Sequence, residues 1–427
     1  MKLKHWAVAL LVLIANPTVS TASSGRAQTP PTIPPGFQVT LYSSIGGNAT
    51  SLAFGPDTRN LSRTRLYVAR FSDGTVVTVD DQGGVGSPPT IFASGFRRPL
   101  GVVVAADGTL FVADSEARRD GVFGNRPYGR VWRVRDTNGD GVGDLKQVVL
   151  KDLPNGRHNT NGMAFGPDGM LYVTNGNSTD DGIDGGEPEV EPWSGSVIKI
   201  DPRASDVSLT SLASMQSLVA TGMRNDYDIA FSPFDPSKLF ITTNGADDAR
   251  PGESTIEAES SDDLLYVTDI DDRRRSSRRT SRFTPQIDHF GFPSCLYNLA
   301  RQGNLEPYDT PHPGVIEAFG PCPKGSVPRP ITTFGLHPSA DGLAFQTTNA
   351  WGPEYLNDLF VAEFGSSFGE PNGRDVVRVE LDAAGLAVTG QTDFLAGSNP
   401  LDVTFDSVGN LFLADFSGEI FKVEKVA

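Results

Sequence analysis

The sequence predicts an all-β fold, specifically a six-bladed β-propeller. A unit of three to four strands recurs about six times, and long amphipathic helical stretches are scarce. Gly and Pro, which favour turns, number 46 and 31 among the 427 residues. One such unit cannot bury both faces of its own sheet, so the copies are expected to close into a single ring.

Each copy of the repeat has the same layout. An apolar strand ends in Phe or Val, a turn leads to a second apolar strand, and a polar loop precedes a Gly with alternating apolar residues. In the third copy the turn Gly166-Pro167-Asp168-Gly169 separates the runs Met163 to Phe165 and Met170 to Val173. The shared position falls at Phe54, Val104, Phe165, Phe231, Phe345 and Phe405, with spacings of roughly 50, 61, 66, 114 and 60 residues. The long interval from Asp269 to Ala340 leaves a seventh, degenerate blade as an alternative.

The N-terminal residues 1–22 are expected to be an export signal. Lys2 and Lys4 precede an apolar core from Trp6 to Ala15, and Ser20-Thr21-Ala22 offers a small-residue cleavage site. The core is short for a membrane span, so a periplasmic or secreted chain without a transmembrane segment is predicted, and an uncleaved anchor is the alternative.

Residues 23–35 are expected to be a linker, and residues 36–427 a single propeller domain. The linker is rich in Pro and Thr. The strand Phe37 to Tyr42 follows it and is expected to complete the last blade and fasten the ring. Cys295 and Cys322 are expected to pair in an oxidising compartment and to staple an insertion around residues 270–340.

The net charge of -16 makes nucleic acid a poor candidate partner. One basic run, DDRRRSSRRTSR from Asp271, interrupts this acidic chain. Its Asp and Ser residues favour a solvated loop over an anion-binding surface.

The repeat also predicts where a small-molecule pocket lies. Residues just before each first strand and just after each second strand are expected to meet around the axis on one face. The first set is Arg97, Arg98, His158, Asn159, Arg224, Asn225, His337, Asp341 and Asn399. The second set is Arg70, Asp114, Asn175, Asn177, Asn244, Asp247, Glu363 and Asp415.

His158 is the candidate catalytic residue. A neutral imidazole at this face can accept a proton from a substrate hydroxyl. A histidine that bonds the backbone of a neighbouring loop is the alternative interpretation. His337 holds the equivalent place in the fifth copy and carries the same two interpretations.

The segment Asp136 to Asp144, DTNGDGVGD, matches a calcium loop. Oxygen ligands at alternate positions followed by Gly suit a hard cation. The expected ligands are Asp136, Asn138, Asp140, Asp144 and the Val142 carbonyl. Position 12 is Gln147 rather than a bidentate Glu, and a polar Asx turn between strands is the alternative.

Four segments resemble the glucose/sorbosone dehydrogenase family, whose members are six-bladed quinoproteins. These are RHNTNGMAFGPDGMLYVTNGN from Arg157, TGMRNDYDIAFSP from Thr221, HFGFPSC from His289 and DLFVAEFGSS from Asp358. The resemblance extends from about Pro35 to Val426. It implies a sugar or aldose dehydrogenase that uses pyrroloquinoline quinone (PQQ) and Ca²⁺, with an electron acceptor that the sequence does not identify.

The resemblance also implies roles for individual residues. His158 matches the family's general base, which removes the hydroxyl proton while hydride passes from the sugar carbon to the quinone. Arg224 and Asn225 match residues that line the cofactor and substrate. Asn177 stands in this cofactor region, where the family has an acidic partner for the base.

The sequence departs from the family pattern in the last blade. Asn399 and Leu401 stand where an arginine for the cofactor carboxylates is expected. Two rival functions therefore remain hypotheses. One is a non-catalytic binding propeller that lost the cofactor site. The other is a calcium-dependent lactonase-type propeller with a site at Asn175, Asn244, Glu363 and Asp415.

Overall fold

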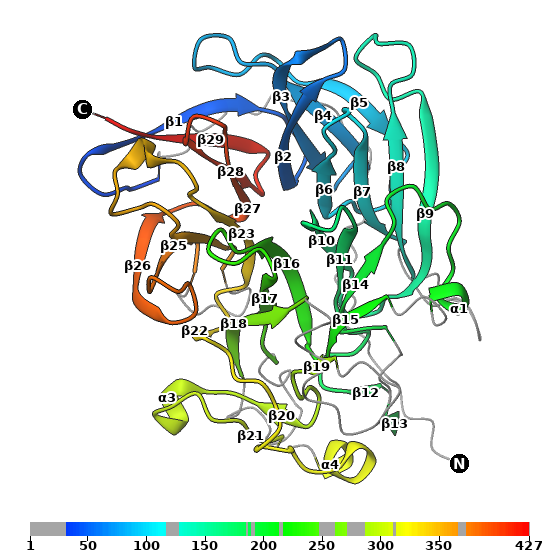
Figure 1. Ribbon diagram of the computed structural model, residues 1–427, viewed down its shortest axis with the longest axis vertical. Helices are drawn as coiled ribbons and strands as arrows, with labels where there is room; N and C mark the ends of the chain where they lie inside the picture. The colour runs from blue at the N-terminus through cyan, green and yellow to red at the C-terminus, as the bar shows by residue number, and fades with distance from the viewer. Residues whose placement is uncertain are drawn as a thin grey trace, which may run out of the picture.

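The protein is a six-bladed β-propeller in the computed structural model, as the repeat predicts (Figure 1). The structure describes residues 31–116, 128–184, 187–188, 193–212, 217–246, 261–270, 287–310, 313–365 and 373–426. The predicted export signal, the start of the predicted linker, the basic run and Asp247 lie outside these residues. Six sheets of four or five strands stand around a central axis, and the first strand of each sheet lies nearest that axis.

The main strands of each blade follow one another in the sequence, apart from β1 in the last blade and the short β19 in blade 3. Blade 1 holds β2 (Ala49–Asp57), β3 (Asn60–Arg70), β4 (Thr75–Val79) and β5 (Thr90–Ser94). Blade 2 holds β6 (Gly101–Val104), β7 (Leu110–Ser115), β8 (Tyr128–Arg135) and β9 (Leu145–Pro154). Blade 3 holds β10 (Thr160–Phe165), β11 (Leu171–Asn175), β14 (Ser196–Ile200), β15 (Leu218–Thr221) and the short β19 (Asp288–His289).

The second half of the ring repeats this order. Blade 4 holds β16 (Asn225–Phe231), β17 (Lys238–Asn244), β18 (Asp262–Asp269) and β22 (Thr332–Leu336). Blade 5 holds β23 (Ala340–Phe345), β24 (Leu359–Glu363), β25 (Asp375–Leu381) and β26 (Val388–Ala396). Blade 6 holds β27 (Pro400–Phe405), β28 (Leu411–Asp415), β29 (Glu419–Lys425) and, from the other end of the chain, β1 (Phe37–Ser44).

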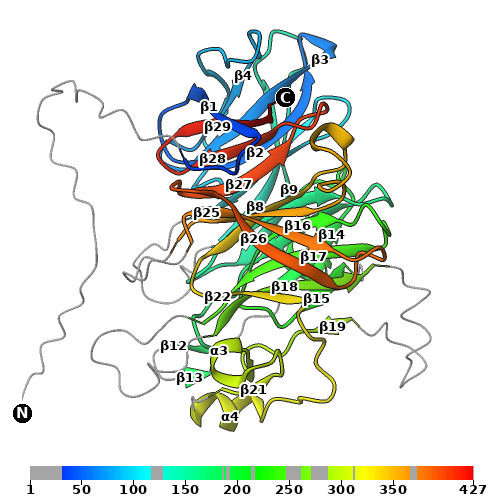
Figure 2. The same cartoon turned by 90° about the vertical axis from the view of Figure 1, so that its left-hand side faces the viewer.

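The long interval in the fourth copy holds an insertion and not a seventh blade. It carries β19, β20 (Cys295–Leu296), α3 (Leu299–Gln302), β21 (Tyr308–Asp309) and α4 (Pro313–Phe319), which lie beside blades 3 and 4 (Figures 1 and 2). The predicted disulfide between Cys295 and Cys322 is confirmed within it. The other short elements are α1 (Leu209–Leu212), the pair β12 (Ile183–Asp184) and β13 (Glu187–Pro188), and η3 (Asn349–Trp351).

The first two strands of every blade share one register. The Phe or Val at the shared position pairs with a Leu of the second strand, in all six blades. The pairs are Phe54–Leu66, Val104–Leu110, Phe165–Leu171, Phe231–Leu239, Phe345–Leu359 and Phe405–Leu411. Apolar clusters fill the space between neighbouring blades, so each sheet face is buried against the next blade. Equivalent residues therefore stand at the same height around the axis.

The ring is closed by β1, as the sequence predicts. This strand pairs with β29 in antiparallel register, from Phe37 opposite Lys425 to Ser44 opposite Glu419. Phe37 packs edge-on against Trp351 at 4.9 Å and Phe394 at 5.0 Å between ring centroids, and both rings belong to blade 5. The N-terminal strand thus joins the last blade to its neighbour.

Replacing Phe37 with Ala is expected to lower the free energy of unfolding by about 3 to 5 kcal/mol, because the change leaves a cavity at this closure. Leu41→Ala on the same strand removes a side chain that is 48% exposed, and is expected to change stability by no more than about 0.5 kcal/mol. Urea denaturation of both variants measures the difference. Equal stability of the two variants would show that the Phe37 contacts do not hold the ring closed.

Candidate active site

A cavity of about 220 Å³ lies at one end of the axis. Its lining comes from every blade and forms two levels, which are described in turn below. The residues that line it are Phe71, Leu100, Arg157, His158, Asn159, Asn161, Asn225, Tyr227, Asn244, Ser339, Asp341, Phe364, Leu401 and Phe416. Its mixture of apolar walls and a few convergent polar groups is typical of a small-molecule site.

The floor of the cavity is built from one position of the repeat, four residues before the shared Phe or Val. We call its five lining residues the floor set: Leu100, Asn161, Tyr227, Asp341 and Leu401. In blades 3, 4, 5 and 6 the strand register shifts at this position, which marks a β-bulge. A bulge adds an unpaired residue and turns its side chain, so the bulges direct Asn161, Tyr227, Asp341 and Leu401 into the cavity, while Leu100 directly precedes its strand.

The wall of the cavity comes from the residue five positions after the paired Leu of the second strand. We call its four lining residues the wall set: Phe71, Asn244, Phe364 and Phe416. Blades 2 and 3 carry Ser115 and Gly176 at this position. The wall set therefore differs from blade to blade on a common scaffold.

The sequence prediction for the second strands was displaced by one residue. Of the predicted second set, only Asn244 lines the cavity, and Asp247 lies outside the described residues. In the other blades the predicted residue comes one position before the wall position. Its side chain points away from the cavity, because side chains alternate along a strand. Asp114 pairs with Arg130 at 3.0 Å, for example, and Asp415 accepts a hydrogen bond from the Asn399 backbone N–H at 2.7 Å. Counting the alternation from the buried residues would have pointed to the phenylalanines.

The prediction for the first strands was better. His158, Asn159, Asn225 and Asp341 line the cavity, whereas Arg97, Arg98, Arg224, His337 and Asn399 do not. Glu363, Asn175 and Asp415 also lie off the cavity, so the four residues proposed for a lactonase-type calcium site do not meet there.

His158 is held in one orientation and one tautomer. Its side chain is 8% exposed, and Nδ1 lies 2.8 Å from the carbonyl oxygen of Asn177. A carbonyl can only accept, so Nδ1 carries the proton and Nε2 carries the lone pair. The loop-backbone contact that was the alternative interpretation is therefore present, and it also prepares the ring to accept a proton.

The acidic neighbour of His158 is Asp180. It lies three residues after Asn177, the position at which the family resemblance places an acidic partner. Asp180 forms ion pairs with Arg224 and, at 3.8 Å, with Arg157. Burial alone would raise the pKa of the Asp180 carboxyl, but the positive charges of Arg224 and Arg157, joined by His158 when its ring is protonated, lower it. Asp180 is therefore ionised at neutral pH and close enough to interact with the imidazole.

The three predicted cofactor residues divide into two groups. Asn225 lines the cavity. Arg224 is 5% exposed and donates from Nε to the Asp180 carbonyl at 2.8 Å. Asn177 donates to the Ser194 hydroxyl at 3.2 Å and accepts from the Thr179 N–H at 2.9 Å. Arg224 and Asn177 thus brace the loop that carries Asp180.

The polar side of the cavity is a chain of amide hydrogen bonds. Asn161 donates to Asn225 at 3.1 Å, Asn225 donates to Asn244 at 2.5 Å, and Asn244 donates to Asp341 at 3.3 Å. Burial and the nearby carboxylate of Asp263 raise the pKa of Asp341 well above its usual value. Asp341 stands at the end of this chain, where burial favours the uncharged form of its carboxyl.

Beneath the floor set, two buried aspartates tie blades together. Asp402 accepts from the Ser51 hydroxyl at 2.8 Å and the Leu52 N–H at 2.9 Å, and Asp228 accepts from the Leu343 N–H at 3.2 Å. A Cβ on Gly162 or Gly342 would come within 2.4 Å of these carboxylates, so both positions need glycine. The aspartates thus stabilise the base of the pocket.

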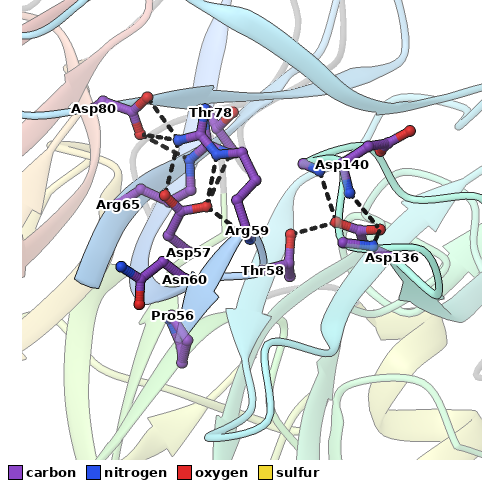
Figure 3. Close-up of polar contacts among 12 residues, drawn as sticks. Pro56, Asp57, Thr58, Arg59, Asn60, Arg65, Thr78, Asp80, Asp136 and Asp140 are labelled. Carbon is purple, nitrogen blue, oxygen red and sulfur yellow. Dashed lines mark hydrogen bonds and ion pairs between the residues drawn. The ribbon is translucent and has the colours of Figure 1, made fainter. Parts of the chain in front are cut away.

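The predicted calcium loop follows β8 at the outer edge of blade 2 (Figure 3). Asp136 accepts from the N–H groups of Gly139 and Gly141 at 2.7 Å each and from the Thr58 hydroxyl at 2.6 Å. Asp144 accepts from Thr137 in the same loop. This is the hydrogen bonding of an Asx turn, and it links blade 2 to the β2–β3 turn of blade 1.

Calcium at this loop stays a prediction. Asp136, Asn138, Asp140 and Asp144 all take part in local hydrogen bonds, which a cation would have to replace. Over the described part of the chain, no three His, Cys, Asp or Glu side chains converge as metal ligands. Nor does any helix there have the length and apolar character needed to cross a membrane.

Comparison with solved structures identifies the fold. A PQQ-bound aldose sugar dehydrogenase from Streptomyces coelicolor is 17% identical, with a TM-score of 0.56 over 92% of this chain and 99% of that chain. The PQQ domain of pyranose dehydrogenase from Coprinopsis cinerea is 14% identical, with a TM-score of 0.68 over 92% and 97%. The chain has the fold of the sugar dehydrogenases. A calcium structure of a family AA12 carbohydrate-active enzyme from Trichoderma reesei shares this sugar-dehydrogenase fold, at 16% identity and a TM-score of 0.69 over 93% and 98%.

Sequence comparisons are less informative than the fold. Residues 70–232 match a domain of unknown function, DUF7133. An uncharacterised protein of Borreliella burgdorferi is 24% identical over 243 residues, so the chain spans about half of that relative, 54% of its length. The sugar-dehydrogenase fold is thus recognised through structure.

Replacing Asp136 with Ala is expected to lower the free energy of unfolding by about 2 kcal/mol at pH 7, because the partly buried donors of Thr58 and Gly141 and the exposed N–H of Gly139 lose their acceptor. Burial by itself would raise the pKa of Asp136, but the hydrogen bonds that its carboxylate accepts lower the pKa in the folded protein. The stabilisation that Asp136 provides is therefore complete above the pKa that this residue has in the unfolded chain. It is lost as the pH falls through the lower pKa of the folded protein. Urea denaturation at pH 7 and in acid should show the difference shrinking. Asp206→Asn, at a surface ion pair, is the control, because Asn tolerates the left-handed backbone conformation of this residue.

The same variant tests calcium. If the loop binds Ca²⁺, adding the ion to chelator-treated protein raises the unfolding midpoint of the wild type and leaves Asp136→Ala unchanged. An equal response in both proteins would contradict the calcium prediction for this loop.

Proposed function

We propose that this protein is an exported quinoprotein-type sugar dehydrogenase with His158 as its general base. The observation that carries the proposal is the position of His158. In a fold shared with PQQ-bound sugar dehydrogenases, it lines the axial cavity with Nδ1 bound to a carbonyl and Nε2 able to accept a proton. The disulfide between Cys295 and Cys322 is compatible with an oxidising compartment.

The residues of the polar side suit PQQ. Asn159 and Asn225 line the cavity with amide groups that can bond quinone and carboxylate oxygens, and Arg157 supplies a positive charge. The amide N–H groups of Asn161 and Asn244 are already engaged within the protein and hold this side of the cavity in place. When bound, PQQ supplies the electron acceptor for a hydride from the substrate carbon. Ca²⁺ is part of the proposal, with Asp136, Asn138, Asp140 and Asp144 as its ligands in a structural role.

The protein's own residues handle the proton. We infer that Nε2 of His158 accepts the proton of the substrate hydroxyl, which places a positive charge on the imidazole. The ionised Asp180 stabilises that charge, and Arg224 and Arg157 hold Asp180 in place. The Asn177 carbonyl keeps the ring from turning.

Replacing His158 with Ala is expected to lower kcat by at least about 100-fold, since the proton acceptor is lost. Binding of PQQ should change little, because the amide donors remain. Calorimetric titration of PQQ and dye reduction with aldoses measure both properties on one sample. Activity retained in His158→Ala would remove this residue from the role of base, and a folded wild type that neither binds PQQ nor oxidises an aldose would overturn the proposal.

Replacing Asp180 with Asn is expected to lower kcat by about 10-fold and to move the acidic limb of the pH–rate profile. Without the carboxylate the imidazolium is less stable, so the proton leaves His158 at lower pH and the limb shifts down in pH. A merely structural role would lower activity without moving the limb. Asp206→Asn, at the protein surface, serves as the control.

A further inference from the structure

One continuous side of the cavity is apolar. We call it the apolar sector, and it consists of Phe364, Leu401, Phe416, Phe71 and Leu100, which come in ring order from blades 5, 6, 6, 1 and 2. Leu100 and Leu401 are each 8% exposed and belong to the floor set. The three phenylalanines are half-buried and belong to the wall set.

The three aromatic rings support one another. Phe364 and Phe416 meet edge to face, with 5.4 Å between centroids, and Phe71 lies 6.4 Å from Phe416. The guanidinium of Arg98 lies over the ring of Phe71, 5.9 Å from its centroid. These contacts fix the rings before any ligand arrives.

The opposite side of the cavity is polar. It carries His158, the amide chain of Asn161, Asn225 and Asn244, and Asp341. Every charged or titratable residue that lines the cavity, among those the structure describes, lies outside the apolar sector. The pocket is thus divided into a half that offers hydrogen bonds and a half that offers none.

This division selects a class of substrate. Sugar hydroxyls placed against the phenylalanines would lose water without gaining partners, and a carboxylate there would cost more. An aromatic or alkyl group loses no hydrogen bonds and gains from burial and ring contacts.

We propose that the apolar sector is a subsite for the aromatic or alkyl group of an uncharged glycoside or alcohol, whose hydroxyl-bearing end faces His158. This inference rests on the proposed function and adds the substrate class. It also gives a physical role to Leu401, the position where the family resemblance leads one to expect a cation.

The test compares phenyl β-D-glucopyranoside with D-glucose by calorimetric titration. The wild type is expected to bind the phenyl glucoside about 10-fold more tightly, since the phenyl ring adds one buried aromatic contact. Phe416→Ala should reduce this preference to about 2-fold, because it weakens the phenyl glucoside more than it weakens glucose. Leu401→Arg should also weaken the phenyl glucoside. Val408→Ala is the control, because Val408 is 67% exposed in the β27–β28 turn of the same blade.

Several results would contradict the proposal of an apolar subsite. These are equal affinities in the wild type, equal loss of both ligands in Phe416→Ala, or tighter PQQ binding in Leu401→Arg with no change for the phenyl glucoside. Thermal unfolding checks that each variant folds, and Phe71→Leu replaces Phe416→Ala if that variant does not. A phenyl preference without PQQ-dependent turnover would support the subsite and overturn the dehydrogenase proposal; turnover without the preference would do the reverse.

Discussion

The structure depends on one repeated backbone pairing. In every blade, the shared Phe or Val of the first strand lies opposite a Leu of the second strand. This fixed register brings equivalent residues of all blades to the same height on the axis. Because the blades pack through buried faces, a change of register in one blade would move both its core residues and its pocket residues.

Different residues close the ring and line the cavity. Closure uses the N-terminal strand β1, which pairs with β29 and anchors Phe37 in blade 5. Below the pocket, Asp228 and Asp402 reach across to neighbouring blades where glycine leaves room. With the ring held from outside and beneath, the floor and wall sets are free to differ between blades.

That freedom produces a pocket of two halves. Blades 3 and 4 supply His158 and the amide chain, while blades 6 and 1 supply phenylalanines and Leu401. The charged group around Asp180 lies behind His158, where Arg224 and Arg157 hold the carboxylate ionised. Proton transfer on one side and apolar recognition on the other are the chemistry that this division favours.

The sequence by itself determined the architecture. The six copies, the closing strand and the paired cysteines could all be read from local pattern, because strand alternation and turn residues are local properties. It also indicated His158, Asn225 and Asp341 at the cavity. In the second strands, simple alternation would have identified the residues that face the axis. In the first strands only the tertiary structure decided this, because bulges, as at Asn161 and Tyr227, shift the alternation by a residue and no local pattern announces them. The same holds for Asp180, whose meeting with His158 depends on how a loop folds back and not on spacing along the chain.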